Sequence, residues 1–181
     1  MIENNGVLVM QYRGVLGALI PGDCGALRFF ARALSLNWKN RKAAGLEDAS
    51  HFVYVETGSY MGLSTQIVTD TVLEAGVPVI SYAHDLFDSS TTGLWGDAPV
   101  ERTNLQNFYD NVKRNDLRSN IIPVIGRSWE TMAIHDAASV DMVFIDGDHT
   151  YEGALEDMRE GFRILKPGGY LLGHDANPES E

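Results

Sequence analysis

Short apolar runs alternate with helical patterns from residue 51 onwards, and this alternation constrains the fold more than any other feature of the sequence. The apolar runs, which we predict to be strands, cover residues 52–55, 77–83, 121–125, 140–145 and 170–173. The segments between them that have helical spacing or helix-end residues cover 64–75, 105–112, 129–135 and 151–165. Strands that alternate with helices form a mostly parallel sheet covered on both faces. We therefore predict a doubly wound, Rossmann-like α/β fold.

Polar side chains follow the predicted strands at the point where each strand ends. These residues are Glu56, Asp85, Ser128, Asp146, His174 and Asp175. In an open parallel sheet the carboxyl ends of the strands lie along one edge, and ligands bind at that edge. We therefore expect these side chains to contribute to one ligand site.

The first predicted strand leads into a turn with two glycines and then into a helix. The turn and its borders contain Glu56, Gly58, Ser59, Tyr60, Gly62 and Ser64. A strand, a glycine-rich turn and a helix N-terminus, where Ser64 is a candidate N-cap, form a cradle for a nucleotide-like ligand. The dinucleotide-binding pattern has a third glycine where this chain has Tyr60. The alternative is that the glycines serve only the geometry of a strand–helix turn.

Asp85 ends the second predicted strand and can accept hydrogen bonds from the ribose hydroxyls of a nucleoside. An acid at this position also disfavours a ribose phosphate. His84 and Asp88 are neighbouring candidates for the same role, and the alternative for Asp85 is a helix cap or a solvated carboxylate. Ser128 is a candidate partner for an adenine edge, or only a cap for a short helix at Trp129.

Asp146, Gly147, Asp148 and His149 place two carboxylates and an imidazole directly after an apolar strand. Asp148 or Thr150 is expected to cap the following helix, but this role does not explain the whole cluster. Histidine is the side chain suited to taking a proton near neutral pH, so His149 is a candidate general base. In the helix that follows, one face carries Tyr151, Leu155, Met158, Phe162 and Leu165.

His174 and Asp175 end the strand after that helix. Adjacent strands lie roughly 4.8 Å apart, so this pair can meet Asp146 around one divalent cation. Carboxylate oxygens with one imidazole suit Mg²⁺ or Mn²⁺ better than a metal that prefers thiolates. The alternative is that His174 and Asp175 only hydrogen-bond to loop backbone.

Composition restricts the partners and the compartment. The net charge of −11 argues against nucleic acid or an anionic membrane surface as a partner. Cys24 is the only cysteine and cannot form an internal disulfide, and no apolar run approaches the roughly 20 residues of a membrane span. We therefore expect a cytoplasmic protein that binds neither nucleic acid nor a membrane.

Taken together, these residues resemble the class I S-adenosylmethionine-dependent methyltransferases over about residues 50–176. The turn from Glu56 to Ser64 is similar to the first motif of catechol O-methyltransferase and of the metal-dependent sugar O-methyltransferases of macrolide biosynthesis. Residues 144–151, 165–170 and 173–175 are the more specific part, and they resemble small-molecule methyltransferases and the related cephalosporin hydroxylase-like proteins.

The resemblance implies a role for each matching position. It implies a cofactor site made of Glu56, Gly58, Ser59, Tyr60, Gly62, Ser64, Asp85, Ser128, Trp129 and Asp146. It implies a metal site of Asp146, His174 and Asp175, with Mg²⁺ as the expected ion, and a catalytic His149. The implied reaction is methyl transfer from S-adenosylmethionine to a hydroxyl group of a small acceptor, a sugar or a phenol.

Residues 1–49 are predicted to form an N-terminal extension, with a strand at 7–12 and a helix at about 24–36, and residues 50–181 to form the cofactor-binding domain. Class I methyltransferases continue with antiparallel strands, so we expect this chain to be C-terminally short. A homo-oligomer is one candidate cover for the open sheet edge. The predicted long loop at 86–100 is a candidate part of the acceptor pocket.

Two other functions remain as alternatives. A nicotinamide-dependent oxidoreductase is compatible with the glycine turn and Asp85, but not with the missing third glycine or with the Asp/His cluster. A non-catalytic cofactor-binding or assembly domain is compatible with the short C-terminal part. The function proposed from the sequence is therefore a cation-assisted O-methyltransferase, with these two as competitors.

Overall fold

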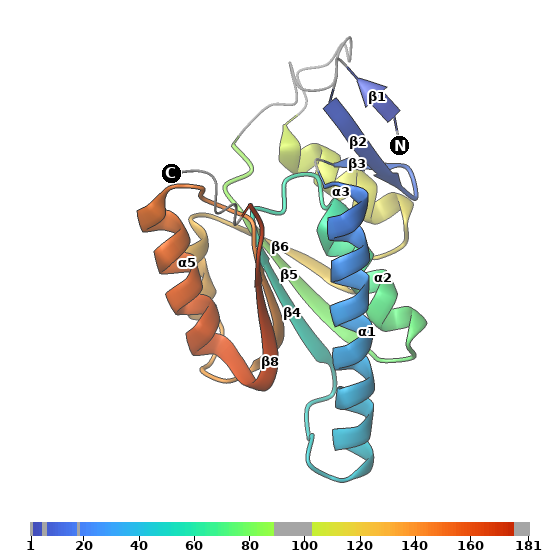
Figure 1. Ribbon diagram of the computed structural model, residues 1–181, viewed down its shortest axis with the longest axis vertical. Coiled ribbons are helices and arrows are strands. Elements are labelled where there is room, and N and C mark those ends of the chain that lie inside the picture. Colours follow the sequence, from blue (N-terminus) through green and yellow to red (C-terminus); the bar gives the residue numbers. More distant parts are fainter. Residues whose placement is uncertain (1, 5–6, 18, 89–102, 176–181) are drawn as a thin grey trace.

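A five-stranded parallel sheet lies at the centre of the computed structural model, which describes residues 2–4, 7–17, 19–88 and 103–175 (Figure 1). Its strands are β4 (Phe52–Thr57), β5 (Val79–Asp85), β6 (Ile121–Ile125), β7 (Val140–Ile145) and β8 (Leu165–Gly173). They follow the order β6-β5-β4-β7-β8, and every neighbouring pair is parallel. The predicted doubly wound, Rossmann-like α/β fold is confirmed.

Helices cover both faces of this sheet (Figure 1). One face carries α1 (Pro21–Ala43), α2 (Leu63–Glu74) and α3 (Asn104–Arg114), and the other carries α4 (Ser128–Thr131), the 3₁₀-helix η1 (Met132–Ile134) and α5 (Tyr151–Ile164). Successive side chains of a strand point to opposite faces. In β4, Phe52 and Tyr54 therefore pack with α1 and α2, whereas Val55 packs on the α5 side. The sheet is held between two hydrophobic cores.

The N-terminal strands form a small antiparallel sheet of their own. It consists of β1 (Ile2–Asn4), β2 (Val7–Tyr12) and β3 (Val15–Gly17), and β2 confirms the predicted strand. The guanidinium of Arg13 lies 2.7 Å from the carboxylate of Asp70 in α2, so an ion pair joins the turn between β2 and β3 to helix α2.

Helix α1 is longer than the predicted helix at 24–36. It begins at Pro21, because proline suits the first helical position and the Asp23 carboxylate accepts a hydrogen bond from the Ile20 N–H at 3.0 Å. Leu27 and Trp38 of α1 are buried in the same core as Phe52 of the sheet. The predicted division of the chain near residue 50 stays a prediction, although α1 packs in this shared core.

Helix α5 buries a different face from the one that carries its large apolar residues. Tyr151 and Phe162 are 78% and 75% exposed, whereas Gly153, Asp157 and Gly161 are buried. A Cβ on Gly161 would lie 3.0 Å from Leu171 and 3.2 Å from Val143, so a small residue lets the helix approach the sheet closely. Gly161 and the buried Ile164, rather than the predicted apolar stripe, mark the side of α5 that faces the sheet.

Several boundaries also differ from the predicted ones. Helix α5 ends at Ile164 and β8 begins immediately, so residues 166–169 lie within β8, where the register shifts relative to β7 between Val140 and Met142. Within the described residues, β8 is the last strand and lies at one edge of the sheet. Most of the predicted loop at 86–100 lies outside the described residues. None of the described helices has the length and apolar character needed to cross a membrane.

Candidate functional site

The turn between β4 and α2 depends on its two glycines. Gly58 has φ +74°, and a Cβ on it would collide with the backbone carbonyl of Asp146 at the end of β7. Gly62 has φ +84°, and a Cβ there would lie 3.0 Å from the ring of Phe108. Tyr60, which replaces the third glycine of the dinucleotide pattern, also has a positive φ of 48°. The turn is therefore fixed by close backbone packing against β7 and α3.

Glu56 is fully buried behind this turn. Its carboxylate accepts hydrogen bonds from the hydroxyl of Tyr54 at 2.6 Å and from the hydroxyl of Ser64 at 2.5 Å. Burial raises the pKa of Glu56 to about 7, and the two hydroxyl donors oppose that shift. The prediction that Ser64 caps α2 is wrong, since Gly62 is the N-cap residue and the Ser64 side chain points to Glu56. Glu56 thus orients Ser64, while its direct contact with a ligand stays a prediction.

Asp85 lies beside the same turn and is bound to backbone. Its carboxylate accepts the N–H of Tyr60 and the N–H of Phe87, both at 2.7 Å. Burial raises the pKa of Asp85, and these two N–H donors oppose that shift. Each carboxylate oxygen can accept more than one hydrogen bond, so the predicted ribose contact remains compatible with this arrangement. The ring of its neighbour His84 instead faces the Thr131 hydroxyl at 2.8 Å.

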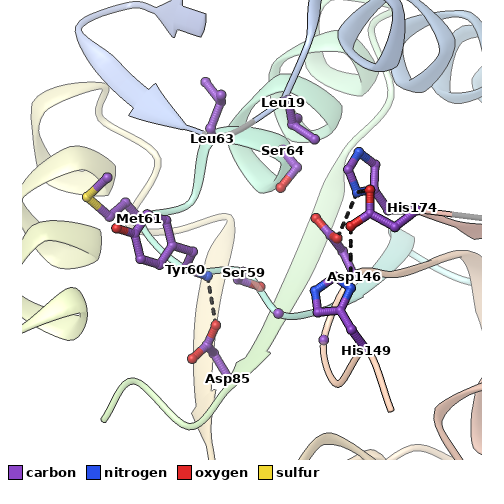
Figure 2. A pocket seen from close by; sticks show the side chains of 13 residues that line it. Leu19, Ser59, Tyr60, Met61, Leu63, Ser64, Asp85, Asp146, His149 and His174 are labelled. Carbon is purple, nitrogen blue, oxygen red and sulfur yellow. Dashed lines mark hydrogen bonds and ion pairs between the residues drawn. The ribbon is translucent and has the colours of Figure 1, made fainter. Parts of the chain in front are cut away.

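Two adjoining cavities lie along the carboxyl edge of the sheet. The first, of about 320 Å³, is lined by Leu19, Gly58, Ser59, Tyr60, Met61, Leu63, Ser64, Asp85, Asp146, Gly147, His149, His174 and Asp175 (Figure 2). The second, of about 480 Å³, is lined by Gly58, His84, Asp85, Leu86, Asp88, Gly126, Arg127, Ser128, Trp129, Gly147 and Asp148. Because both cavities include Gly58, Asp85 and Gly147, one elongated ligand can extend from one cavity into the other past Asp85.

The second cavity contains the predicted adenine-side residues. The Ser128 hydroxyl donates a hydrogen bond to the buried Asp157 carboxylate of α5 at 2.5 Å, and the N-cap of α4 is Arg127 rather than Ser128. The ring of Trp129 lies 5.7 Å from the Arg127 guanidinium. Asp157 was not predicted to belong to the site, although its spacing of four residues from both Gly153 and Gly161 places all three on one helical face.

Asp146, His149 and His174 lie on the wall across the first cavity from Tyr60 and Asp85 (Figure 2), and Asp175 contacts both histidines. The Nδ1 atom of His174 lies 3.1 Å from Asp146 Oδ1 and 3.0 Å from Asp175 Oδ1. The Nδ1 atom of His149 lies 3.3 Å from Asp175 Oδ2. The structure thus brings the predicted catalytic residue and the three predicted metal ligands together.

The electrostatics of this wall differ from those around Glu56. Burial raises the pKa of Asp146 to about 6, although His174 and His149 oppose the shift. Burial would lower the pKa of His174, but the carboxylates of Asp146, Asp23 and Asp175 outweigh it and raise that pKa. Asp23 belongs to α1, and its carboxylate lies 3.2 Å from His174 Nε2. Asp23 and the cavity residue Leu19 were not predicted to belong to the site, because both precede the strand–helix alternation.

The donor set of this wall fits a divalent cation. Single ligand atoms of Asp146, His149 and Asp175 lie within 4.8 Å of one another, and His174 Nδ1 faces the same two carboxylates. Two carboxylates with an imidazole form an oxygen-rich set suited to Mg²⁺ or Mn²⁺. The first cavity also fits a polar ligand, since the buried Ser59 hydroxyl has no hydrogen-bond partner in the described part of the chain.

A parallel sheet of this order, with a glycine turn after one strand and an acid after the next, defines a nucleotide-cofactor-binding α/β domain. Comparison with known proteins identifies the domain more closely. Residues 55–176 match the family described as the methyltransferase domain. This match covers more than half of the chain, and the chain therefore belongs to that family of S-adenosylmethionine-dependent methyltransferases.

Solved structures with low sequence identity share the fold. The precorrin 8W decarboxylase of Methanobacterium thermoautotrophicum is 19% identical, with a TM-score of 0.55 over 91% of this chain and 67% of that one. A methyltransferase from Geobacter sulfurreducens is 14% identical, with a TM-score of 0.57 over 87% and 64%. A Staphylococcus aureus protein named as a caffeoyl-CoA O-methyltransferase is 14% identical, with a TM-score of 0.52 over 83% and 65%. The chain spans about two thirds of the length of these proteins.

Proposed function

We propose that this chain transfers a methyl group from S-adenosylmethionine to a hydroxyl group of a small acceptor, with the assistance of a divalent cation. The observation that supports this function best is the meeting of Asp146, His149, His174 and Asp175 on one wall of the cavity that also includes the glycine turn. Methyl transfer needs a donor site and a proton acceptor close together. This wall provides a proton acceptor, His149, beside the predicted donor site at the glycine turn.

The donor would extend along the two cavities. Ser59, Ser64 and the turn backbone would bind its amino acid end, and Asp85 would accept from its ribose hydroxyls. Ser128 and Trp129 would border the adenine in the second cavity. Glu56 would fix the Ser64 side chain at the cavity wall by accepting a hydrogen bond from its hydroxyl.

His149 would act on the acceptor hydroxyl. Its ring is exposed at the rim, and Asp175 lies 3.3 Å from its Nδ1 atom, which leaves Nε2 available to accept a proton. S-adenosylmethionine supplies an electrophilic methyl group, and a bound divalent cation supplies positive charge that lowers the pKa of a hydroxyl. Asp146, His174 and Asp175 would hold that cation. The role of the protein is mainly to align the two reactants.

Oxygen is the proposed accepting atom, and the acceptor is proposed to be a sugar or a phenol. One of the structures that share the fold is named as an O-methyltransferase, which supports the choice of oxygen. Carboxylates beside a general base also suit a hydroxyl, because a hydroxyl must lose its proton during the reaction.

The direct test has two stages. Isothermal titration with S-adenosylhomocysteine should show binding, and transfer of a radiolabelled methyl group to a panel of phenols and sugars should require added Mg²⁺ and stop with a chelator. A folded sample that does not bind S-adenosylhomocysteine would overturn the proposal. Binding without transfer to any hydroxylated acceptor would favour the non-catalytic alternative, and enhanced fluorescence of a reduced nicotinamide cofactor on mixing would favour the oxidoreductase.

A further inference from the structure

Asp23 reaches the candidate cation site from a helix that precedes the strand–helix alternation. It lies in the first turn of α1, and its Oδ2 atom is 3.2 Å from His174 Nε2. The same oxygen accepts the Ile20 N–H at 3.0 Å. The side chains of Asp23 and His174 are only 28% and 22% exposed, so this contact is partly shielded from water.

The two ring nitrogens of His174 face different partners. Nε2 faces Asp23, whereas Nδ1 lies 3.1 Å from Asp146 Oδ1 and 3.0 Å from Asp175 Oδ1. The ring also packs against the edge of Phe144, with centroids 6.2 Å apart. A carboxylate that holds one N–H of an imidazole fixes the tautomer and the direction of the other nitrogen, as in metal sites whose histidine ligands are oriented by acids.

We propose that Asp23 is a positioning residue of the candidate cation site: it holds the Nε2–H of His174 so that Nδ1 points into the space shared by the carboxylates of Asp146 and Asp175. This inference rests on the proposed cation-assisted function and adds a residue outside the strand ends. It also makes α1 part of the site, together with Leu19, which lines the cavity four positions earlier.

A second role of Asp23 makes a different prediction. As a helix cap for the Ile20 N–H, Asp23 would stabilise α1 without a specific effect on the cation. Loss of a cap alone would lower the melting temperature and would change the affinities for the cation and for the cofactor product together. The positioning role predicts that only the affinity for the cation changes.

The test measures Mn²⁺ affinity by electron paramagnetic resonance of the full chain saturated with S-adenosylhomocysteine. Asp23→Ala should weaken Mn²⁺ binding about 10-fold or more, the size of effect seen when an orienting partner of a metal ligand is lost. Asp23→Asn should lie between wild type and Asp23→Ala, because its amide oxygen can still accept the Nε2–H. The affinity for S-adenosylhomocysteine, measured by isothermal titration, should change less than about 2-fold in both variants.

Glu74→Gln is the matched control. Glu74 of α2 also pairs with α1, at 3.0 Å from Arg28 and 3.5 Å from Arg32, and it does not line the first cavity. The substitution removes the same charge from a contact with the same helix, so it should leave Mn²⁺ affinity unchanged. A second readout is the ¹⁵N spectrum of His174 with S-adenosylhomocysteine and without added metal, in which the population of the Nε2–H tautomer should fall in Asp23→Ala.

The outcomes separate the inference from the proposed function. Wild-type Mn²⁺ affinity retained in Asp23→Ala would overturn the role of Asp23 and leave the cation-assisted function standing. Equal losses of Mn²⁺ and S-adenosylhomocysteine affinity would also overturn it, because they indicate a purely structural role. No Mn²⁺ binding by the wild-type chain would overturn both the cation assistance and the inference.

Discussion

Glu56 and Asp146 end neighbouring strands, yet the two sides of the site around them are built differently. Around Glu56 and Asp85, a buried or half-buried carboxylate accepts hydrogen bonds from hydroxyls or from backbone N–H groups. Around Asp146, imidazole rings face carboxylates, and His149 and Asp175 are 62% and 59% exposed. The first side is fixed by backbone packing and neutral donors, whereas the second is held by contacts between imidazoles and carboxylates that a bound ligand can rearrange.

The largest effect is expected from Gly58→Ala, on the side that backbone packing fixes. The new Cβ would collide with the carbonyl of Asp146, and the positive φ of 74° disfavours any residue with a Cβ. We expect a loss of at least about 3 kcal/mol in the free energy of unfolding, measured by urea denaturation, and no binding of S-adenosylhomocysteine. Wild-type stability in this variant would show that the two strand ends are not packed as described.

Asp146→Ala tests the side that contacts between imidazoles and carboxylates hold. It removes a carboxylate that faces His174 at 3.1 Å, and we expect turnover to fall about 100-fold and its dependence on Mg²⁺ to disappear. The affinity for S-adenosylhomocysteine should fall much less, because the glycine turn and Asp85 remain. Turnover assays with and without Mg²⁺ check this expectation, and unchanged dependence on Mg²⁺ would contradict the assignment of Asp146 as a ligand.

Glu56 should make stability depend on pH. Its pKa is about 7 in the folded chain and 4.5 ordinarily, so between these values the folded chain keeps a proton that the unfolded chain has released. The contribution to stability is therefore present below about pH 4.5 and lost as the pH rises through 7, by up to about 3 kcal/mol. Urea denaturation of wild type and Glu56→Gln across this range measures it, since the glutamine cannot ionise.

The expected difference between the two curves has a definite sign. Glu56→Gln should gain stability relative to wild type as the pH rises from 5 to 8, because only the wild-type carboxyl becomes charged in a buried position. A constant difference across that range would mean that Glu56 titrates at its ordinary pKa. The two proteins should bind Mn²⁺ with similar affinity, because Glu56 does not line the cavity that contains the candidate cation site.

The smallest effect is expected from Ser128→Ala. It removes the hydroxyl that donates to the buried Asp157 carboxylate at 2.5 Å, which should cost about 1 to 3 kcal/mol of unfolding free energy. Ser128 lines the second cavity only, so Mn²⁺ affinity should not change. Equal thermal stability of the variant and wild type would show that Asp157 does not depend on this donor.

The parallel sheet and the shared edge of its strand ends could be predicted, because they follow from the strand–helix alternation and from the rule that parallel strands end together. The polar residues at strand ends were found for the same reason, and Asp146, His149, His174 and Asp175 do meet. The direction in which a side chain points could not be predicted in the same way. Ser64 stood where an N-cap would stand, but the backbone after Gly62 turns its hydroxyl toward Glu56.

Other features depended on packing that no local pattern records. The apolar stripe of α5 suggested a buried face, but the helix packs on the sheet through Gly161, which faces Leu171 and Val143, and through the buried Ile164. Asp23 directly precedes the helix that was predicted at about 24–36, and no sequence pattern connects it with the strand ends. Its contact with His174, 151 positions away along the chain, follows only from how α1 lies on the sheet.

The packing of α1 on the sheet determines where a truncated form of this chain can begin. The stretch that matches the family, residues 55–176, contains most of the side chains at the strand ends but neither Leu19 nor Asp23. It also lacks Leu27, Trp38 and Phe52, which share one core with α2. A truncated chain that keeps the core and the cavity lining must therefore begin before Leu19. The segment that the family match covers is shorter than the segment that packs into one folded unit.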